Sequence, residues 1–346
     1  MKTRHILAAG ITAGLLAAPL PAAAQTVDGP SVSWNLSTWG KKRAFTKGME
    51  VVAEMIDKRT GGKFKIKIHY GEALSKAREN LDGIKIGAFQ MAQFCNFYHP
   101  GKNPAWMVFS LPFLALDDWE VSRKVRIAML KHPALVADMA RWNAIPYKSG
   151  LLPQYEFLGR GTAPAKLEDW KGRRVRAGGG LGDAMRKLGA VLTTVPATEV
   201  FTSIERGTMD AASMPYTYAH AAYQIHTVTT WFTSNMSPGT SECAAVINKD
   251  AYAKLPPQYR QLLQDVLPAA YDAQIKAYKD IDAKNLPMFR AKLKEVKYSA
   301  AELKRFADFA GKPVWDKWVD DNKGKFDSKG VLTTILAEIE KARGKK

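Results

Sequence analysis

Apolar and polar residues repeat along this chain with two periods, one typical of strands and one typical of amphipathic helices. Across 63–70 the even positions are apolar or aromatic and the odd positions are lysine or histidine, which predicts a half-buried strand. Across 41–59 apolar residues recur at Phe45, Met49, Val52 and Ile56, and two glycines follow at 61–62. That spacing predicts a helix that ends at the glycines.

The same two patterns alternate along the rest of the chain. Further strands are predicted at 32–36, 90–94, 144–152, 191–195 and 210–214, and one more strand ends at Val175. Helices are predicted at 78–86, from Asp117, around 135–142, at 182–188, and from a Thr198 cap to Arg206. A long helical tract, either continuous or broken near Pro287, is expected over 256–293, followed by helices at 300–309, 314–322 and 329–343. The alternation predicts an α/β fold with parallel or mixed sheets, helices on both faces and a long helical C-terminal region.

The first 24 residues have the pattern of a Sec-type signal peptide. Lys2 and Arg4 precede an apolar run over 6–20, and three alanines at 22–24 form a small-residue cleavage site. We expect cleavage after Ala24 and a mature chain outside the cytoplasm. About 320 residues remain, more than one ordinary core holds, which predicts two lobes.

The chain is basic and has two cysteines. Its formal net charge is +18, from 51 lysines and arginines and 33 acidic residues. Such a balance is typical of proteins that bind nucleic acid, acidic surfaces or anionic ligands, and export argues against nucleic acid. An oxidising compartment would allow one disulfide between Cys95 and Cys243, and two buried free thiols are the alternative.

The segment WKGRRVRAGGGLGDAM at 170–185 has the pattern of an anion site. A basic strand ends at Arg176, three glycines follow, and a helix begins. Bare N–H groups and the helix dipole favour negative charge at such a turn, and the Arg176 guanidinium suits a carboxylate. The alternative is a basic surface loop with a glycine-rich turn.

No catalytic signature accompanies this segment. The sequence contains no HExxH, GxSxG or P-loop motif, and its histidines do not have the spacing of metal ligands. We therefore expect no enzyme activity, no metal site and no cofactor. Ligands of open α/β sheets bind beyond the carboxyl ends of strands, and the loops there are rich in aromatic and amide side chains. The predicted ligand-binding residues are Asn35, Trp39, Phe94, Asn96, Tyr98, Gln154, Tyr155, Arg176, Gly178, Met214, Tyr216 and Tyr218.

Several short motifs in order resemble the periplasmic solute-binding proteins of TRAP transporters, the DctP-type receptors. They are GEALS at 71–75, LPF at 111–113, LEDWKG at 167–172, VR at 175–176, PATEVF at 196–201, GTMD at 207–210, VINK at 246–249 and LPP at 255–257. The resemblance implies a two-lobe periplasmic-binding-protein architecture that closes over an organic acid. It also implies two membrane partners, the small and large permease subunits. We place the first lobe at 25–148 plus about 237–285, and the second at 149–236 plus about 286–346.

In this family the arginine that Arg176 matches binds the ligand carboxylate. Many members carry a second arginine near Tyr155 and an asparagine or a tryptophan-containing segment at 213–216, where this chain has SMPY. Some relatives bind a metal through a glutamate near Ser213, and serine does not support that ion. One arginine with apolar and aromatic walls predicts a monocarboxylate with an apolar or aromatic body. The alternatives are a secreted hydrolase with an unrecognised site, another class of solute receptor, and a basic protein that adheres to anionic surfaces.

Overall fold

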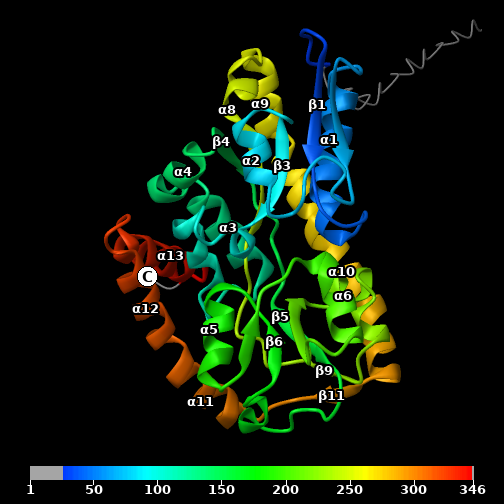
Figure 1. Cartoon of the computed structure of the whole chain (residues 1–346). Helices are drawn as coiled ribbons and strands as arrows, with labels where there is room; N and C mark the ends of the chain where they lie inside the picture. Colours follow the sequence, from blue (N-terminus) through cyan, green and yellow to red (C-terminus); the bar gives the residue numbers. More distant parts are fainter. Residues whose placement is uncertain (1–25, 345–346) are drawn as a thin grey trace, which may run out of the picture.

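The computed structural model describes residues 26–344, which form two α/β lobes stacked end to end (Figure 1). The predicted signal peptide and its cleavage site lie outside these residues. Two sheets, one in each lobe, organise the described chain, and helices flank both of them. The expected two-lobe α/β fold is confirmed. None of the helices within 26–344 has the length and apolar composition needed to cross a bilayer.

The first sheet has the strand order β2-β1-β3-β10-β4. Its strands are β1 (Val32–Ser37), β2 (Phe64–His69), β3 (Met91–Cys95), β4 (Ala144–Lys148) and β10 (Cys243–Asn248). The strand β1 pairs in parallel with β2 and β3, whereas β10 runs antiparallel to β3 and β4. The helices α1 (Lys47–Arg59) and α9 (Pro257–Asp265) share a hydrophobic core with one face of this sheet. The 3-10 segment η3 (Pro104–Ser110), α3 (Trp119–Met129) and α4 (Pro133–Ala140) share another with the opposite face.

The second sheet has the order β11-β9-β5-β8-β6-β7. Its strands are β5 (Tyr155–Gly159), β6 (Arg174–Arg176), β7 (Val191–Thr193), β8 (Ala211–Pro215), β9 (Trp231–Thr233) and β11 (Lys294–Val296). The strand β6 is parallel to β7 and β8, and β5 is antiparallel to β8 and β9. Both sheets are therefore mixed, as expected.

The remaining helices connect or cover these sheets. They are α2 (Asn80–Lys85), α5 (Gly179–Lys187), α6 (Ala197–Glu205), α7 (Tyr218–Ala222), α8 (Lys249–Ala253), α10 (Leu267–Lys292), α11 (Ala300–Ala310), α12 (Lys312–Asn322) and α13 (Ser328–Ala342). The long helix α10 packs against α1 in the first lobe and against α7 and β11 in the second. In Figure 1 it runs down one side of the molecule past both lobes.

Several local predictions were wrong. The strand expected at 144–152 ends at Lys148, and a second strand, β5, starts at Tyr155 in the other lobe. The helix α6 begins at Ala197 after Pro196, so Thr198 lies inside the helix and is not its cap. At Pro287 the continuous alternative holds, since the proline is accommodated inside α10 without ending it. Helix α13 packs against α3 and η3, so the assignment of all of 286–346 to the second lobe fails for this helix. The other lobe boundaries stay predictions.

Four segments carry the chain between the lobes: 149–154, 234–242, α10, and α12, which packs against α5 in the second lobe and leads into α13 on the first. The first two run side by side, since Tyr155 N donates to Gly239 O at 2.8 Å and Thr240 Oγ1 to Leu152 O at 2.8 Å. Crossings of this kind form a hinge between the two lobes.

Candidate functional site

The facing ends of the two lobes enclose a small cavity of about 20 Å³, room for about one water molecule. Its walls are largely aromatic and come from both lobes. The first lobe contributes Trp39, Arg43, Cys95, Phe97, Tyr98 and Cys243, and the second contributes Tyr155, Arg176, Ala197, Met214, Pro215, Tyr218, Ala219 and Tyr223. Six of the predicted site residues lie together here: Trp39, Tyr98, Tyr155, Arg176, Met214 and Tyr218.

Arg176 is the last residue of β6 and is only 1% exposed. Its Nη1 donates to Ser213 O at 2.7 Å and its Nε to Val195 O at 3.2 Å. The guanidinium carbon lies 5.0 Å from the centre of the Phe97 ring, across the cleft. No carboxylate among residues 26–344 forms an ion pair with Arg176, whose charge therefore has no acidic counterpart within the described protein. A buried guanidinium without a counter-charge favours an anion beside it.

Tyr98 lies between the lobes beside Arg176. Its Oη accepts a hydrogen bond from Ala197 N at 2.8 Å, which joins the first lobe to the start of α6. Burial raises the pKa of the Tyr98 phenol, and the nearby Arg176 charge opposes part of that rise. The phenol is therefore neutral at physiological pH, and its own O–H can donate to a ligand.

Arg43, Phe97 and Tyr223 also line the cleft, and sequence reasoning missed them. Arg43 comes after β1 and is the last of three consecutive basic residues, which in sequence are typical of the solvated start of a helix. Its guanidinium lies over three rings, those of Trp39, Phe45 and Tyr223, at 5.7, 4.9 and 5.6 Å. The only sequence signal was its position four residues after Trp39, just beyond the carboxyl end of the strand.

The glycines after Arg176 allow the lobes to approach closely. A Cβ on Gly178 would lie 2.4 Å from Cδ2 of Phe97, and one on Gly180 would lie 2.6 Å from Ser110 O. Gly179 and Gly180 line a separate cavity of about 480 Å³ beside α12. The interpretation of these glycines as part of one anion site with Arg176 is therefore corrected. They fit the start of α5 against η3, and Gly178 touches the cleft only through Phe97.

Five other predicted site residues have different neighbours. Phe94 packs on Trp106 at 5.1 Å in the first-lobe core, because side chains alternate across β3 and it is Cys95 that faces the cleft. Asn35 Oδ1 is 2.8 Å from His69 Nε2, and Asn96 Nδ2 donates to Trp106 O and to Ser110 Oγ. Gln154 Oε1 accepts from Ser237 Oγ at 3.1 Å, and Tyr216 N donates to Gln154 O. These five side chains lie outside the cavity lining.

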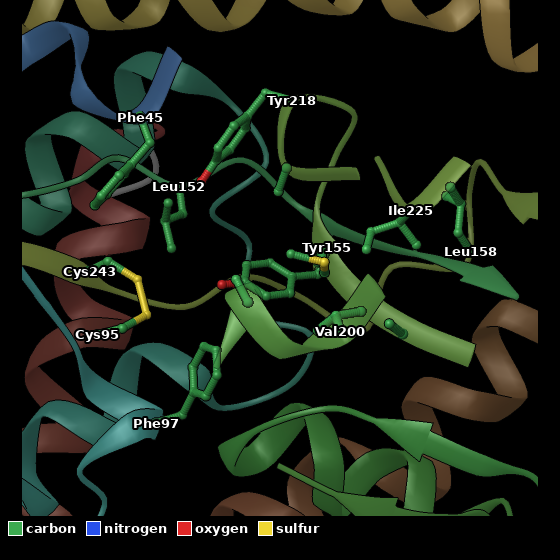
Figure 2. Close-up of a cluster of buried hydrophobic side chains, with 14 of the residues drawn as sticks. Phe45, Cys95, Phe97, Leu152, Tyr155, Leu158, Val200, Tyr218, Ile225 and Cys243 are labelled. Carbon is green, nitrogen blue, oxygen red and sulfur yellow. A yellow bond between two sulfur atoms is a disulfide. The ribbon is translucent and has the colours of Figure 1, made fainter. Parts of the chain in front are cut away.

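Cys95 and Cys243 form a disulfide in the cleft wall, which decides between the two alternatives left open by the sequence. The two residues are directly opposite each other in the antiparallel pair of β3 and β10. Figure 2 shows the bond on the same side of the cleft as the Phe97 ring, with Tyr155 facing it from the second lobe.

A buried charged network holds the hinge next to the cleft. Glu242 accepts hydrogen bonds from Arg126 Nη1 at 2.6 Å, Ser149 Oγ at 2.6 Å and Gly150 N at 2.8 Å. The Arg126 and Glu242 side chains have no solvent exposure. Lys148 lies in the same network and donates to Ser149 O and to Gln274. Burial lowers the pKa of the Lys148 ammonium to about 7, and the Glu242 charge opposes part of this shift.

Two lobes joined by several chain crossings, with a buried arginine in the cleft between them, define the class of a two-lobe solute receptor. The family model described as "Bacterial extracellular solute-binding protein, family 7" (DctP) matches residues 37–322, and the chain belongs to this family. Members of the family are periplasmic receptors of TRAP transporters, which confirms the resemblance found in the sequence.

Relatives and solved structures agree with this assignment. A monocarboxylate 2-oxoacid-binding periplasmic protein of Nostoc sp. is 24% identical over 267 residues, covering 74% of this chain and 70% of the relative. A TRAP solute-binding protein of Rhodoferax ferrireducens, crystallised with copurified benzoate, has a TM-score of 0.80 at 20% identity, covering 91% and 99% of the two chains. A Bordetella pertussis receptor that binds pyroglutamic acid, DctP6, has a TM-score of 0.77 at 19% identity, covering 90% and 100%. At these identities the structures share the fold with this chain.

Proposed function

We propose that this protein binds an organic monocarboxylate with an apolar or aromatic body and delivers it to a TRAP permease. The observation that carries the proposal is the buried Arg176 guanidinium, which has no acidic partner among residues 26–344 and lines an aromatic cavity between the lobes. A ligand carboxylate would supply the missing negative charge. The hydrogen bonds that Arg176 donates to Ser213 O and Val195 O hold the guanidinium in place before the ligand binds.

The rest of the cavity supports an apolar ligand body. Phe97, Tyr155 and Met214 form walls that are all less than 4% exposed. Contact with such walls removes apolar ligand surface from water and favours binding by roughly 25 cal/mol per Å². The named ligands of the three relatives above, a monocarboxylate 2-oxoacid, benzoate and pyroglutamic acid, agree with a carboxylate on a compact body.

Ligand entry requires the lobes to separate, because the closed cavity has only about 20 Å³ of space. Closure would then bring Phe97 and Tyr98 of the first lobe against Arg176 and Ala197 of the second. A receptor that closes on its ligand presents the permease with a surface that the open form lacks. We propose the small and large permease subunits as the partners and the periplasm as the compartment, after signal-peptide cleavage at Ala24.

The test is ligand binding by variants of two arginines on one strand. Wild type, Arg176→Ala, Arg176→Lys and Arg174→Ala are screened against a panel of carboxylic acids by thermal shift, and the hits are measured by calorimetry. A ligand present at a hundred times its Kd should stabilise the wild-type protein by about 2.7 kcal/mol. We expect Arg176→Ala to abolish measurable binding and Arg176→Lys to weaken it strongly, since lysine lacks the planar pair of donors.

Arg174 is the matched control. It lies two residues earlier on β6, is half exposed and pairs with Asp210, so its removal should leave ligand affinity unchanged. Binding by Arg176→Ala as tight as by wild type would refute the site. The absence of any carboxylate ligand for the wild-type protein would refute the proposed function.

A further inference from the structure

A second guanidinium lines the cleft and is fixed from several sides. Arg43 precedes the first turn after β1, and its Nη1 donates to Trp39 O and to Lys41 O, each at 2.7 Å. The rings of Trp39, Phe45 and Tyr223 surround the guanidinium carbon. Arg43, like Arg176, forms no ion pair with any carboxylate between residues 26 and 344. The group is therefore preorganised without a negative partner from the described protein.

Two donors at this place are buried and lack a hydrogen-bond partner within the described residues: Nε of Arg43 and Oη of Tyr223. They come from opposite lobes, since Arg43 follows β1 and Tyr223 ends α7. The Tyr223 hydroxyl lies close to the loop that carries Arg43. A Cβ built on Gly40 of that loop would be only 2.4 Å from the Tyr223 Oη. Buried N–H and O–H groups without an acceptor are unfavourable, so such a pair indicates a place where an acceptor binds.

A series of ring contacts links the two guanidiniums. Arg176 lies over Phe97, whose ring centre is 4.9 Å from that of Tyr98. Tyr98 is in turn 5.6 Å from Trp39, the ring that lies under Arg43. Both guanidiniums line the same cavity, so a ligand held at Arg176 by its carboxylate would have Arg43 in the lining around the rest of its body.

We propose that Arg43 and Tyr223 bind a second acceptor oxygen of the ligand. This inference rests on the proposed function and narrows the ligand to a monocarboxylic acid with a hydroxyl or oxo oxygen away from the carboxylate. Because Arg43 and Tyr223 belong to different lobes, an acceptor between them joins the lobes directly. Acids with that oxygen should therefore be held in the closed form, and acids without it should bind more weakly.

The experiment compares acids that differ only in the second acceptor. Calorimetry on the mature protein measures benzoate against 3-hydroxybenzoate, phenylacetate against 4-hydroxyphenylacetate, and pentanoate against 4-oxopentanoate. For wild type we expect at least one substituted acid to bind ten-fold or more tightly than its parent acid. In Tyr223→Phe and in Arg43→Lys the ratio of the parent acid's Kd to the substituted acid's Kd should fall at least five-fold.

Tyr252→Phe is the control, a tyrosine on α8 in the first lobe and outside the cleft lining, and it should retain the full preference. Equal affinities within every pair would overturn this inference and leave the proposed function intact. So would a preference that survives in both variants. Failure of every acid to bind the wild-type protein would overturn the proposed function and this inference together.

Discussion

The buried pair of Arg126 and Glu242 leads to a quantitative prediction for Glu242→Gln. The substitution preserves the shape of the side chain and removes its charge. Arg126 Nη1, Ser149 Oγ and Gly150 N all donate to the carboxylate, so the amide NH₂ of glutamine would face at least one of these donors. Arg126 would also be left buried without its counter-charge.

Breaking a fully buried pair by changing one partner costs about 3–5 kcal/mol. We expect a loss in the upper part of this range, because three donors lose their charged acceptor together. The assay is urea denaturation followed by tryptophan fluorescence, in which the free energy of unfolding is compared between wild type and variant. The double variant Arg126→Met/Glu242→Gln should recover part of the loss, since it removes the unpaired charge.

Glu168→Gln is the matched control. Glu168 pairs with Arg305 at the surface, where both side chains are about half exposed, and such pairs contribute about 0–1 kcal/mol. A loss below about 1 kcal/mol for Glu242→Gln would refute the view that this carboxylate holds the hinge together. Equal losses in the single and double variants would refute the charge argument specifically.

Three further predictions concern stability. The Cys95–Cys243 bond closes a loop with a sequence separation of 148. In the chain-entropy model the double alanine variant should therefore lose about 5 kcal/mol of unfolding free energy, measured by urea denaturation. Unchanged stability of this variant would contradict the prediction. Folded Lys148 binds fewer protons than the unfolded chain between its folded pKa of about 7 and the ordinary value of 10.5, so stability should rise with pH across that window. Lys148→Met should flatten this rise by roughly 5 kcal/mol, and a parallel profile of unfolding free energy against pH would refute the assignment. Gly180→Ala should cost about 1–3 kcal/mol, because the new Cβ would lie against Ser110 O, whereas Gly101→Ala, with open space around it, should be neutral in the same denaturation assay.

The sequence predicted elements well where one face of the element is buried and the other is solvated. Strand β2 and helix α1 show this, since their periodic patterns reflect burial on one side. Strand β5 was missed, and since all five of its residues are buried, no alternation marks it; β3 and β8 are equally buried and were nevertheless predicted. The end of β4 was misplaced because the hinge segment that follows is also buried and apolar at 151–152.

The candidate site was predictable only where local sequence carries the signal. Arg176 was found because an arginine that ends a buried strand before glycines is unusual in itself. Phe94 was chosen where Cys95 and Phe97 face the cleft, and an error of one position in a strand reverses the face. Arg43 and Tyr223 could not be paired from sequence, because their contact depends on how the two lobes meet.

The helix α10 limits how the cleft can open. Its 26 residues extend over about 39 Å at 1.5 Å per residue, and it packs on both lobes. A rod attached at both ends resists sliding the lobes apart in parallel. On the opposite side α12 also joins the lobes, since it packs against α5 and leads into α13, so opening of the cleft must bend both connections (Figure 1). Pro287 removes one backbone hydrogen bond from the part of this rod that lies in the second lobe, which makes that part the easiest to bend. The energy needed to bend these helices opposes wide opening of the cleft.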